Sequence, residues 1–185
     1  MAARGRRGVL LDRDGTLGPN AGDRAIKRFD LYPWTAAALA RLHAAGYVLA
    51  IVTNQPAVAR GLMTLTSMQA VHTSLVDELA TFQAPIAGVY VCPHHPTAAT
   101  VPEFRIVCDC RKPRPGLLLQ AAAAHDLDLQ ASIMIGDGGW DMEAARAAGC
   151  QGAYLGDDTA VAADFCAKDL RHAVDWIIST KTERA

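Results

Sequence analysis

Five short runs of the chain are apolar almost throughout, which is the pattern of β-strands covered on both faces. The runs are GVLLD (8–12), YVLAIVT (47–53), GVYVC (88–92), SIMIGD (132–137) and GAYL (152–155). Valine and isoleucine recur in them, and β-branched side chains favour extended backbone. We therefore predict five buried strands at these positions.

Between these runs, the spacing of apolar residues is helical. The predicted helices cover residues 35–46, 66–82, 115–127, 140–149 and 170–180. Pro115 suits a first helical turn, and Gly46 and Gly149 suit helix ends. This alternation of strand and helix predicts an α/β fold, with a parallel sheet and helices on both of its faces.

The chain shows no internal repeat, low-complexity segment or linker. Its 185 residues are enough to bury one substantial core. We predict a single domain over residues 1–185, with residues 1–7 and 181–185 as flexible tails. The basic residues Arg4, Arg6 and Arg7 are interpreted as part of an ordinary solvated terminus.

The net charge of −1 gives no electrostatic reason to expect nucleic acid or an anionic membrane as a partner. No segment approaches the ~20 continuous apolar residues that span a bilayer. We therefore expect a cytoplasmic protein. We also expect a monomer that acts on a small molecule, although the sequence does not fix the oligomeric state. In the cytoplasm, cysteines are typically thiols or metal ligands, and the isolated Cys150 and Cys166 suit the core or its edge.

Polar residues end most of the predicted strands. The residues at these ends are Asp12, Thr53, Cys92 and Asp137. Parallel α/β sheets bind ligands at this edge. Asp14 follows Asp12 closely, and neighbouring carboxylates resist joint ionisation unless a cation is near. Because Mg²⁺ prefers oxygen ligands and bridges to phosphate, the acids together with Lys112 predict a magnesium-dependent phosphate site.

A second group of possible ligands lies between residues 91 and 116. Cys92, His94, Cys108 and Cys110 form a C-x-H pair and a C-x-C pair separated by thirteen residues. Zn²⁺ binds three thiolates and one imidazole tetrahedrally, and a site with all four positions filled is structural. His95 is an alternative to His94. A structural zinc would hold this loop and bring Arg111 and Lys112 toward the strand ends.

Four segments follow the order of a known set of motifs. DRDGT (12–16), VTNQPAVARG (52–61), CRKPRPG (110–116) and IGDGGWDMEAARAAG (135–149) together resemble the motifs of the haloacid dehalogenase (HAD) superfamily. The resemblance covers roughly residues 8–155. The cysteine-rich segment narrows it to the phosphatases of heptose 1,7-bisphosphate and of histidinol phosphate. It implies a Rossmann-like sheet with strand order 5-4-1-2-3 and a zinc-bound loop.

The resemblance also implies roles in catalysis. Asp12 would attack phosphorus and form an aspartyl-phosphate. Asp14 would be the general acid for the leaving group and then the general base for water. Thr53, Asn54 and Lys112 would bind the transferring phosphoryl group.

The same resemblance implies the metal ligands. Asp12, the main-chain carbonyl of Asp14 and Asp137 would bind Mg²⁺. Asp141 would orient the Asp137 loop or cap the following helix rather than bind the metal. At the zinc site, the resemblance favours His94 over His95.

The intervals between the motifs leave no room for a cap domain, because a helix and a strand already fill each of them. Loops would therefore shape the site, where Arg60 and Arg111 could meet a second phosphate. We expect a small sugar bisphosphate as substrate, foremost the 7-phosphate of D-glycero-D-manno-heptose 1,7-bisphosphate. Histidinol phosphate or another small phosphosugar is the alternative.

Two positions depart from the resembled motifs. Gly138 stands where heptose bisphosphate phosphatases usually have lysine and the histidinol-phosphate enzymes arginine. Pro56 stands where serine is more usual. Because Gly138 removes a cation expected near the substrate, the identity and the anomer of the sugar stay open.

Two other classes of protein share parts of this pattern. A receiver-type signalling domain also combines a parallel sheet with acids, a threonine and a lysine, but its phospho-acceptor follows a middle strand and it has no zinc loop. The other class is a non-catalytic zinc-binding interaction module. Release of phosphate with and without Mg²⁺ separates both from an enzyme.

Overall fold

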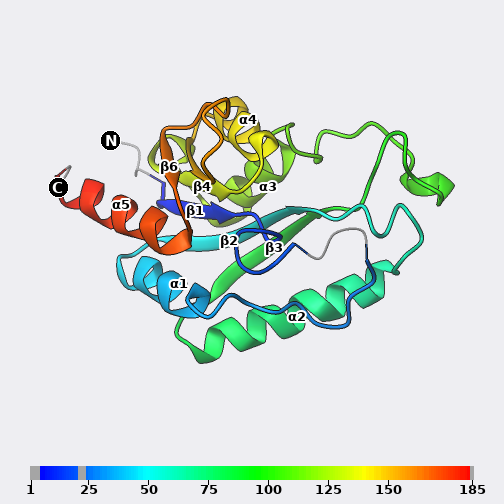
Figure 1. The fold of residues 1–185 in the computed structure, drawn as a ribbon, viewed down its shortest axis with the longest axis horizontal. Helices are drawn as coiled ribbons and strands as arrows, with labels where there is room; N and C mark the ends of the chain where they lie inside the picture. Colours follow the sequence, from blue (N-terminus) through cyan, green and yellow to red (C-terminus); the bar gives the residue numbers. More distant parts are fainter. Residues whose placement is uncertain (1–4, 21–23, 184–185) are drawn as a thin grey trace.

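The computed structural model describes residues 5–20 and 24–183, with side chains up to residue 180. One parallel sheet of six strands, in the order β3-β2-β1-β4-β5-β6, forms the centre of the fold (Figure 1). The strands are β1 (Gly8–Leu11), β2 (Val48–Asn54), β3 (Ile86–Cys92), β4 (Ile133–Gly136), β5 (Gln151–Leu155) and β6 (Phe165–Ala167).

The five predicted strands and their order 5-4-1-2-3 are confirmed. The sixth strand, β6, was not predicted; it pairs with β5 and extends the sheet by one strand at that edge. Strand β6 is only three residues long, with the sequence FCA, so its apolar run is shorter than the runs that mark the other strands.

Among the described residues, five α-helices cover the two faces of the sheet. They are α1 (Thr35–Ala44), α2 (Leu65–Thr81), α3 (Gly116–His125), α4 (Gly139–Ala148) and α5 (Leu170–Glu183), with short 3₁₀ turns η1 (Pro102–Phe104) and η2 (Leu129–Ala131). Helices α3 and α4 lie on one face, and α1, α2 and α5 on the other (Figure 1). Each predicted helix is present, with ends shifted by a few residues.

Strand β1 shows how the two cores arise. Its side chains alternate between the faces of the sheet, so Val9 and Leu11 pack with α1, α2 and α5, whereas Leu10 packs with α3 and α4. All three are fully buried. This explains why the strand is apolar without alternation.

The predicted tails lie only partly within the described residues. Residues 1–4 and 184–185, and with them Arg4, lie outside. Arg6 forms a β-bridge with Leu127, and its N–H donates to the carbonyl of Asp126 at 2.7 Å. Helix α5 continues to Glu183.

The long loop between β3 and α3, residues 93–115, extends past the carboxyl ends of the strands (Figure 1). No cap domain interrupts the intervals between the motifs in residues 24–183, in agreement with the prediction. None of the helices described is long and apolar enough to cross a membrane.

Candidate active site

The carboxyl ends of β1 and β4 bring three acids together. Asp12 follows β1, and its N–H donates to the carbonyl of Ile135 at 2.9 Å, which extends the pairing of these neighbouring strands. Asp137 follows β4, and Asp141 lies in the first turn of α4. One carboxylate oxygen from each of the three acids lies within 4.8 Å of the others.

Lys112 is the cation of this cluster. Its ammonium group is completely buried and lies 2.8 Å from Asp12 Oδ1 and 2.6 Å from Asp141 Oδ1. It also donates to the carbonyl of Val52 at 2.8 Å. Burial alone would lower the pKa of Lys112, but attraction to the two acids outweighs it and raises the pKa, so the group stays charged.

The acids carry more negative charge than Lys112 balances. Burial and the charge of Asp12 raise the pKa of Asp137 to about 6. Burial also raises the pKa of Asp141 to about 7, although Lys112 opposes this shift. Crowded oxygen ligands with surplus negative charge fit a hard divalent cation such as Mg²⁺. Of the acids, Asp141 is the least available for it, because its Oδ2 accepts the Gly138 N–H at 3.1 Å and its Oδ1 pairs with Lys112.

Gly15 allows the close approach of the β1 and β4 loops. Its φ is +79°, and a Cβ atom at this position would lie 1.7 Å from Asp137 Oδ2. Any larger residue would therefore displace the Asp137 carboxylate.

Thr53 and Asn54, at the end of β2, lie beside the acids. Thr53 is fully buried. Asn54 forms two hydrogen bonds with the main chain of Lys112: Nδ2 donates to its carbonyl at 3.0 Å, and Oδ1 accepts its N–H at 3.1 Å. The amide that was expected to bind phosphate thus also holds the Lys112 loop against β2.

A cleft of about 410 Å³ opens over these groups. Asp12, Asp14 and Asp137 line it together with the two predicted arginines, Arg60 and Arg111. The structure therefore brings every predicted catalytic and substrate residue to the wall of this cleft except Thr53, which is fully buried and does not line it.

Trp140 forms an apolar wall of the cleft that sequence reasoning missed. The side chain is half exposed, and a Cβ atom on Gly138 would lie 2.3 Å from its ring. The indole ring thus occupies the space that a side chain at position 138 would enter. The departure at Gly138 replaces an expected cation by an aromatic surface.

The four predicted zinc ligands also come together. The Sγ atoms of Cys92 and Cys108 lie 3.6 Å apart, and those of Cys108 and Cys110 3.2 Å. His94 Nδ1 lies 3.3 Å from the Cys110 sulfur and 3.7 Å from that of Cys92. A tetrahedral Zn²⁺ site has ligand separations of about 3.6–3.8 Å, so the four side chains fit this ion after small adjustments.

His95 takes no part in this group, because its Nδ1 accepts the main-chain N–H groups of Thr97 and Ala98 at 3.3 and 2.9 Å. The carbonyl of His94 accepts a hydrogen bond from Arg111 Nη1 at 3.0 Å. The Cys–His group is thereby connected directly to a cation of the cleft.

Sequence reasoning also missed three buried polar side chains around Asp14. They are Arg13, Gln55 and His72. His72 carried a signal, since it shares a helical stripe with Met68, Val71 and Leu75, and a polar residue on a buried stripe requires a partner.

This parallel sheet, with its acids and lysine at the carboxyl rim, is the arrangement implied by the four motifs. A model of the haloacid dehalogenase-like hydrolases matches residues 18–149. The chain belongs to this family, which confirms the resemblance.

Individual relatives within this family have more specific names. The chain is 41% identical over 157 residues to the D-glycero-beta-D-manno-heptose-1,7-bisphosphate 7-phosphatase of Rhodopseudomonas palustris, covering 83% of this chain and 86% of that protein. It is also 41% identical over 141 residues to the protein of that name from Escherichia coli K12, covering 76% and 73%. A crystal structure of D,D-heptose 1,7-bisphosphate phosphatase from B. bronchiseptica, complexed with magnesium and phosphate, superposes with a TM-score of 0.81 at 26% identity over 94% of this chain and 99% of that one.

Proposed function

We propose that the protein is a magnesium-dependent phosphatase that removes the 7-phosphate of D-glycero-β-D-manno-heptose 1,7-bisphosphate. The observation that carries the proposal is the buried ion pair of Lys112 with Asp12, at the rim where Asp137 also lies. The names of the relatives from R. palustris and E. coli support the β-anomer of this sugar bisphosphate as the substrate.

Two arginines support a doubly phosphorylated substrate. Arg60 and Arg111 line the cleft in addition to Lys112, and a guanidinium group binds phosphate oxygens in pairs. One phosphate would lie at Asp12, and the arginines would bind the other. The Trp140 wall would face the apolar side of the sugar ring.

In the first step, a carboxylate oxygen of Asp12 attacks phosphorus and the P–O bond to the sugar breaks. Lys112 holds Oδ1 of Asp12 and so orients the carboxylate toward the cleft. Asp14 gives its proton to the departing sugar oxygen. The products of this step are the free sugar hydroxyl and an aspartyl-phosphate on Asp12.

In the second step, water attacks the same phosphorus atom. Asp14, now a carboxylate, takes the proton from the water, and the bond between phosphorus and Asp12 breaks. This releases inorganic phosphate and restores both acids to their starting states. One group thus serves as acid and then as base.

Mg²⁺ would be held by Asp12, the main-chain carbonyl of Asp14 and Asp137, and would neutralise the charge that builds up on the phosphoryl oxygens. Lys112 contributes a fixed positive charge on the other side of Asp12. Asp141 keeps Lys112 and the Gly138 main chain in place.

Zn²⁺ would be held by Cys92, His94, Cys108 and Cys110. Since all four positions are then filled by protein atoms, the zinc takes no part in the reaction and stabilises the loop. Through Arg111 and Lys112, which directly follow Cys110, the loop carries two cations into the cleft.

The experiment is hydrolysis of both anomers of heptose 1,7-bisphosphate and of histidinol phosphate, with and without Mg²⁺. We expect the highest kcat/KM for the β-anomer, with the remaining phosphate at position 1 by ³¹P NMR. A higher kcat/KM for histidinol phosphate, or release of the 1-phosphate, would refute the substrate assignment.

Asp12→Asn tests the nucleophile in the same assay. Because the amide cannot attack phosphorus, we expect turnover to fall by a factor on the order of 10³ or more with the fold retained. Asp30→Asn is the matched control, since Asp30 is exposed and lies outside the cleft. Normal turnover by Asp12→Asn would end the assignment.

A further inference from the structure

We propose that Arg13, held in place by His72 and Gln55, is the positioning residue that orients Asp14 for proton transfer. The inference rests on the proposed role of Asp14 as general acid and base. It assigns a function to a buried polar network that the reaction steps above leave unused.

Arg13 stands between the two acids of the first motif, yet its side chain is almost completely buried. Its guanidinium group contacts a single oxygen of Asp14: Nε and Nη2 donate to Oδ2 at 3.1 and 2.8 Å. The ring of Phe29 lies under the guanidinium, 4.8 Å from its central carbon. Burying a charged group is costly unless it is paired, and here the Asp14 carboxylate provides the opposite charge.

Gln55 holds the same oxygen from the other side. Its Nε2 donates to Asp14 Oδ2 at 2.6 Å and to Thr53 Oγ1 at 2.9 Å, and its Oε1 accepts from Arg13 Nη2 at 2.8 Å. Only one orientation of the amide works, because a flip would direct its N–H groups at the guanidinium. Gln55 therefore connects Thr53, Asp14 and Arg13 in a defined geometry.

His72 supports the far end of Arg13. Its Nε2 lies 2.8 Å from Arg13 Nη1. An arginine can only donate, so Nε2 accepts, and the imidazole is neutral with its proton on Nδ1. Burial, together with the charge of Arg13, lowers the pKa of His72 to about 4, so the accepting form persists at neutral pH.

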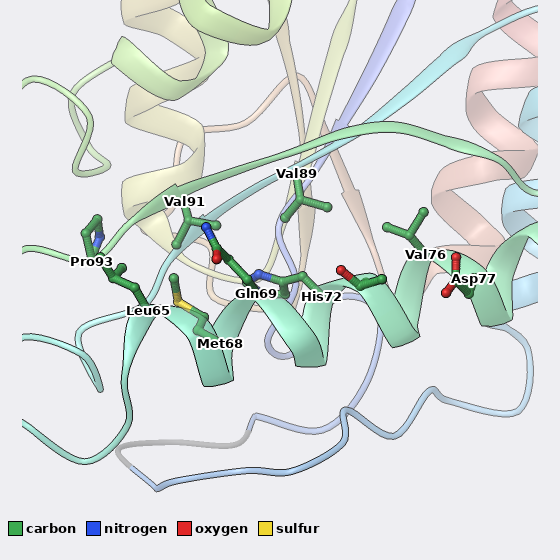
Figure 2. Close-up of a pocket in the computed structure, with 10 residues that line it drawn as sticks. Leu65, Met68, Gln69, His72, Val76, Asp77, Val89, Val91 and Pro93 are labelled. Atoms are coloured by element: carbon green, nitrogen blue, oxygen red, sulfur yellow. The ribbon is translucent and has the colours of Figure 1, made fainter.

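His72 belongs to α2, which covers one face of the sheet. Figure 2 shows it among the side chains that line a groove between α2 and β3, with Gln69, Val76 and Val89 nearby. The network thus runs from this helix through Arg13 to the catalytic rim. Asp14 is positioned by three elements: its own loop, the end of β2 and α2.

The consequence concerns the two oxygens of Asp14. Oδ2 accepts three hydrogen bonds from Arg13 and Gln55, so the proton that moves to the leaving oxygen is carried by Oδ1. A carboxyl group anchored at one oxygen cannot rotate away from the substrate. A correctly placed general acid accelerates a reaction by a factor of about 10²–10⁴. Incorrect placement would lose part of this acceleration.

A leaving-group comparison tests this role. The release of a sugar hydroxyl requires a proton, whereas p-nitrophenolate leaves without one. We expect His72→Leu to slow the single-turnover phosphorylation of Asp12 by the sugar bisphosphate by a factor of about 10 or more. Phosphorylation by p-nitrophenyl phosphate should change by less than about 3-fold, because it does not depend on the acid.

His72→Gln is the matched variant, because its side-chain oxygen can still accept from Arg13, and it should restore most of the rate with the sugar. Gln55→Met removes the other support of Asp14 and should show the same leaving-group dependence if His72→Leu does not fold. Thermal unfolding checks that each variant is folded.

An equal loss of phosphorylation rate with both substrates would overturn the proposal, since it would indicate a purely structural role. A wild-type protein that hydrolyses neither substrate would instead overturn the proposed function.

Discussion

A single buried ammonium group organises the catalytic rim. Lys112 has three N–H groups, and all of them are engaged, by Asp12, Asp141 and the Val52 carbonyl. The group therefore acts on an incoming phosphate mainly through its charge, unless it gives up one of these partners. Arginine could not replace Lys112, since the buried space fits a compact ammonium group rather than a larger, planar guanidinium group.

Gly15 gives the sharpest prediction for a single residue. In Gly15→Ala the new Cβ would collide with the Asp137 carboxylate. We expect a loss of Mg²⁺ affinity of at least about 10-fold, as for disrupted ligand support in other metal sites, and a parallel loss of activity. Calorimetric titration with Mg²⁺ measures the first and phosphate release the second.

Gly149→Ala is the control for backbone strain in this experiment. Gly149 has nearly the same φ, +78°, but nothing lies within 4 Å of its Cβ position. Both variants should lose about 1 kcal/mol or more of stability from the left-handed backbone. Equal Mg²⁺ affinity in the two variants would show that a Cβ atom at position 15 does not displace the Asp137 carboxylate.

At the scale of elements, the 93–115 loop depends on its proposed zinc. Apart from its ligands it contains little apolar burial, and exposed Ile106 and Val107 lie within it. Cys108→Ala should therefore remove the zinc and lower stability by several kcal/mol, which corresponds to a fall in Tm of about 10 °C. Elemental analysis should find one zinc per chain in the wild type and none in the variant.

Activity should fall with the zinc, because Arg111 contacts the His94 carbonyl and Lys112 follows two residues after Cys110. Added Mg²⁺ should restore neither property. Cys166→Ala is the control, since Cys166 is exposed on β6 and lies outside the ligand group. Full activity in verified zinc-free protein would exclude this role.

The elements themselves were largely predictable. Strands buried on both faces must be apolar throughout. Runs such as 47–53 are short and apolar and alternate with segments of clear helical periodicity, so they were recognisable as buried strands. The short β6 was missed because its three residues carry too little sequence pattern to predict a strand. It is a strand because it pairs with β5. The stop at Gly149 was predicted correctly, since the position has the left-handed backbone that glycine favours.

At the scale of the whole molecule, the candidate site was only partly predictable. Asp12 and Asp137 follow strands, and topology alone places strand ends together. The supporting network is different: Arg13, Gln55 and His72 come from three separate elements and meet only after packing. An arginine between two aspartates looks solvent-exposed in sequence, and only the tertiary structure shows that it is buried.

His72 also predicts how stability depends on pH. Its pKa falls from 6.5 to about 4 on folding, so between these values the unfolded chain binds the proton and the folded chain does not. Stability is therefore retained above pH 6.5 and lost as the pH falls toward 4, by up to about 3 kcal/mol. Urea unfolding at several pH values measures this loss.

His72→Gln should flatten this part of the pH profile, because glutamine does not titrate. His43→Gln, at an exposed position on α1, should leave the profile close to that of the wild type. A wild-type profile no steeper than that of His72→Gln would show that folding does not lower the pKa of His72.

The parallel sheet also separates the molecule into two ends. Because the strands are parallel, their carboxyl ends lie at the rim where the cleft opens. Gly8, where β1 begins, and the Arg6–Leu127 bridge therefore lie at the opposite rim. A bead, a biosensor chip or a fused partner attached near that rim would leave the entrance to the cleft facing the bulk solution. The enzyme should therefore turn over at the same rate when immobilised there as it does when it diffuses freely.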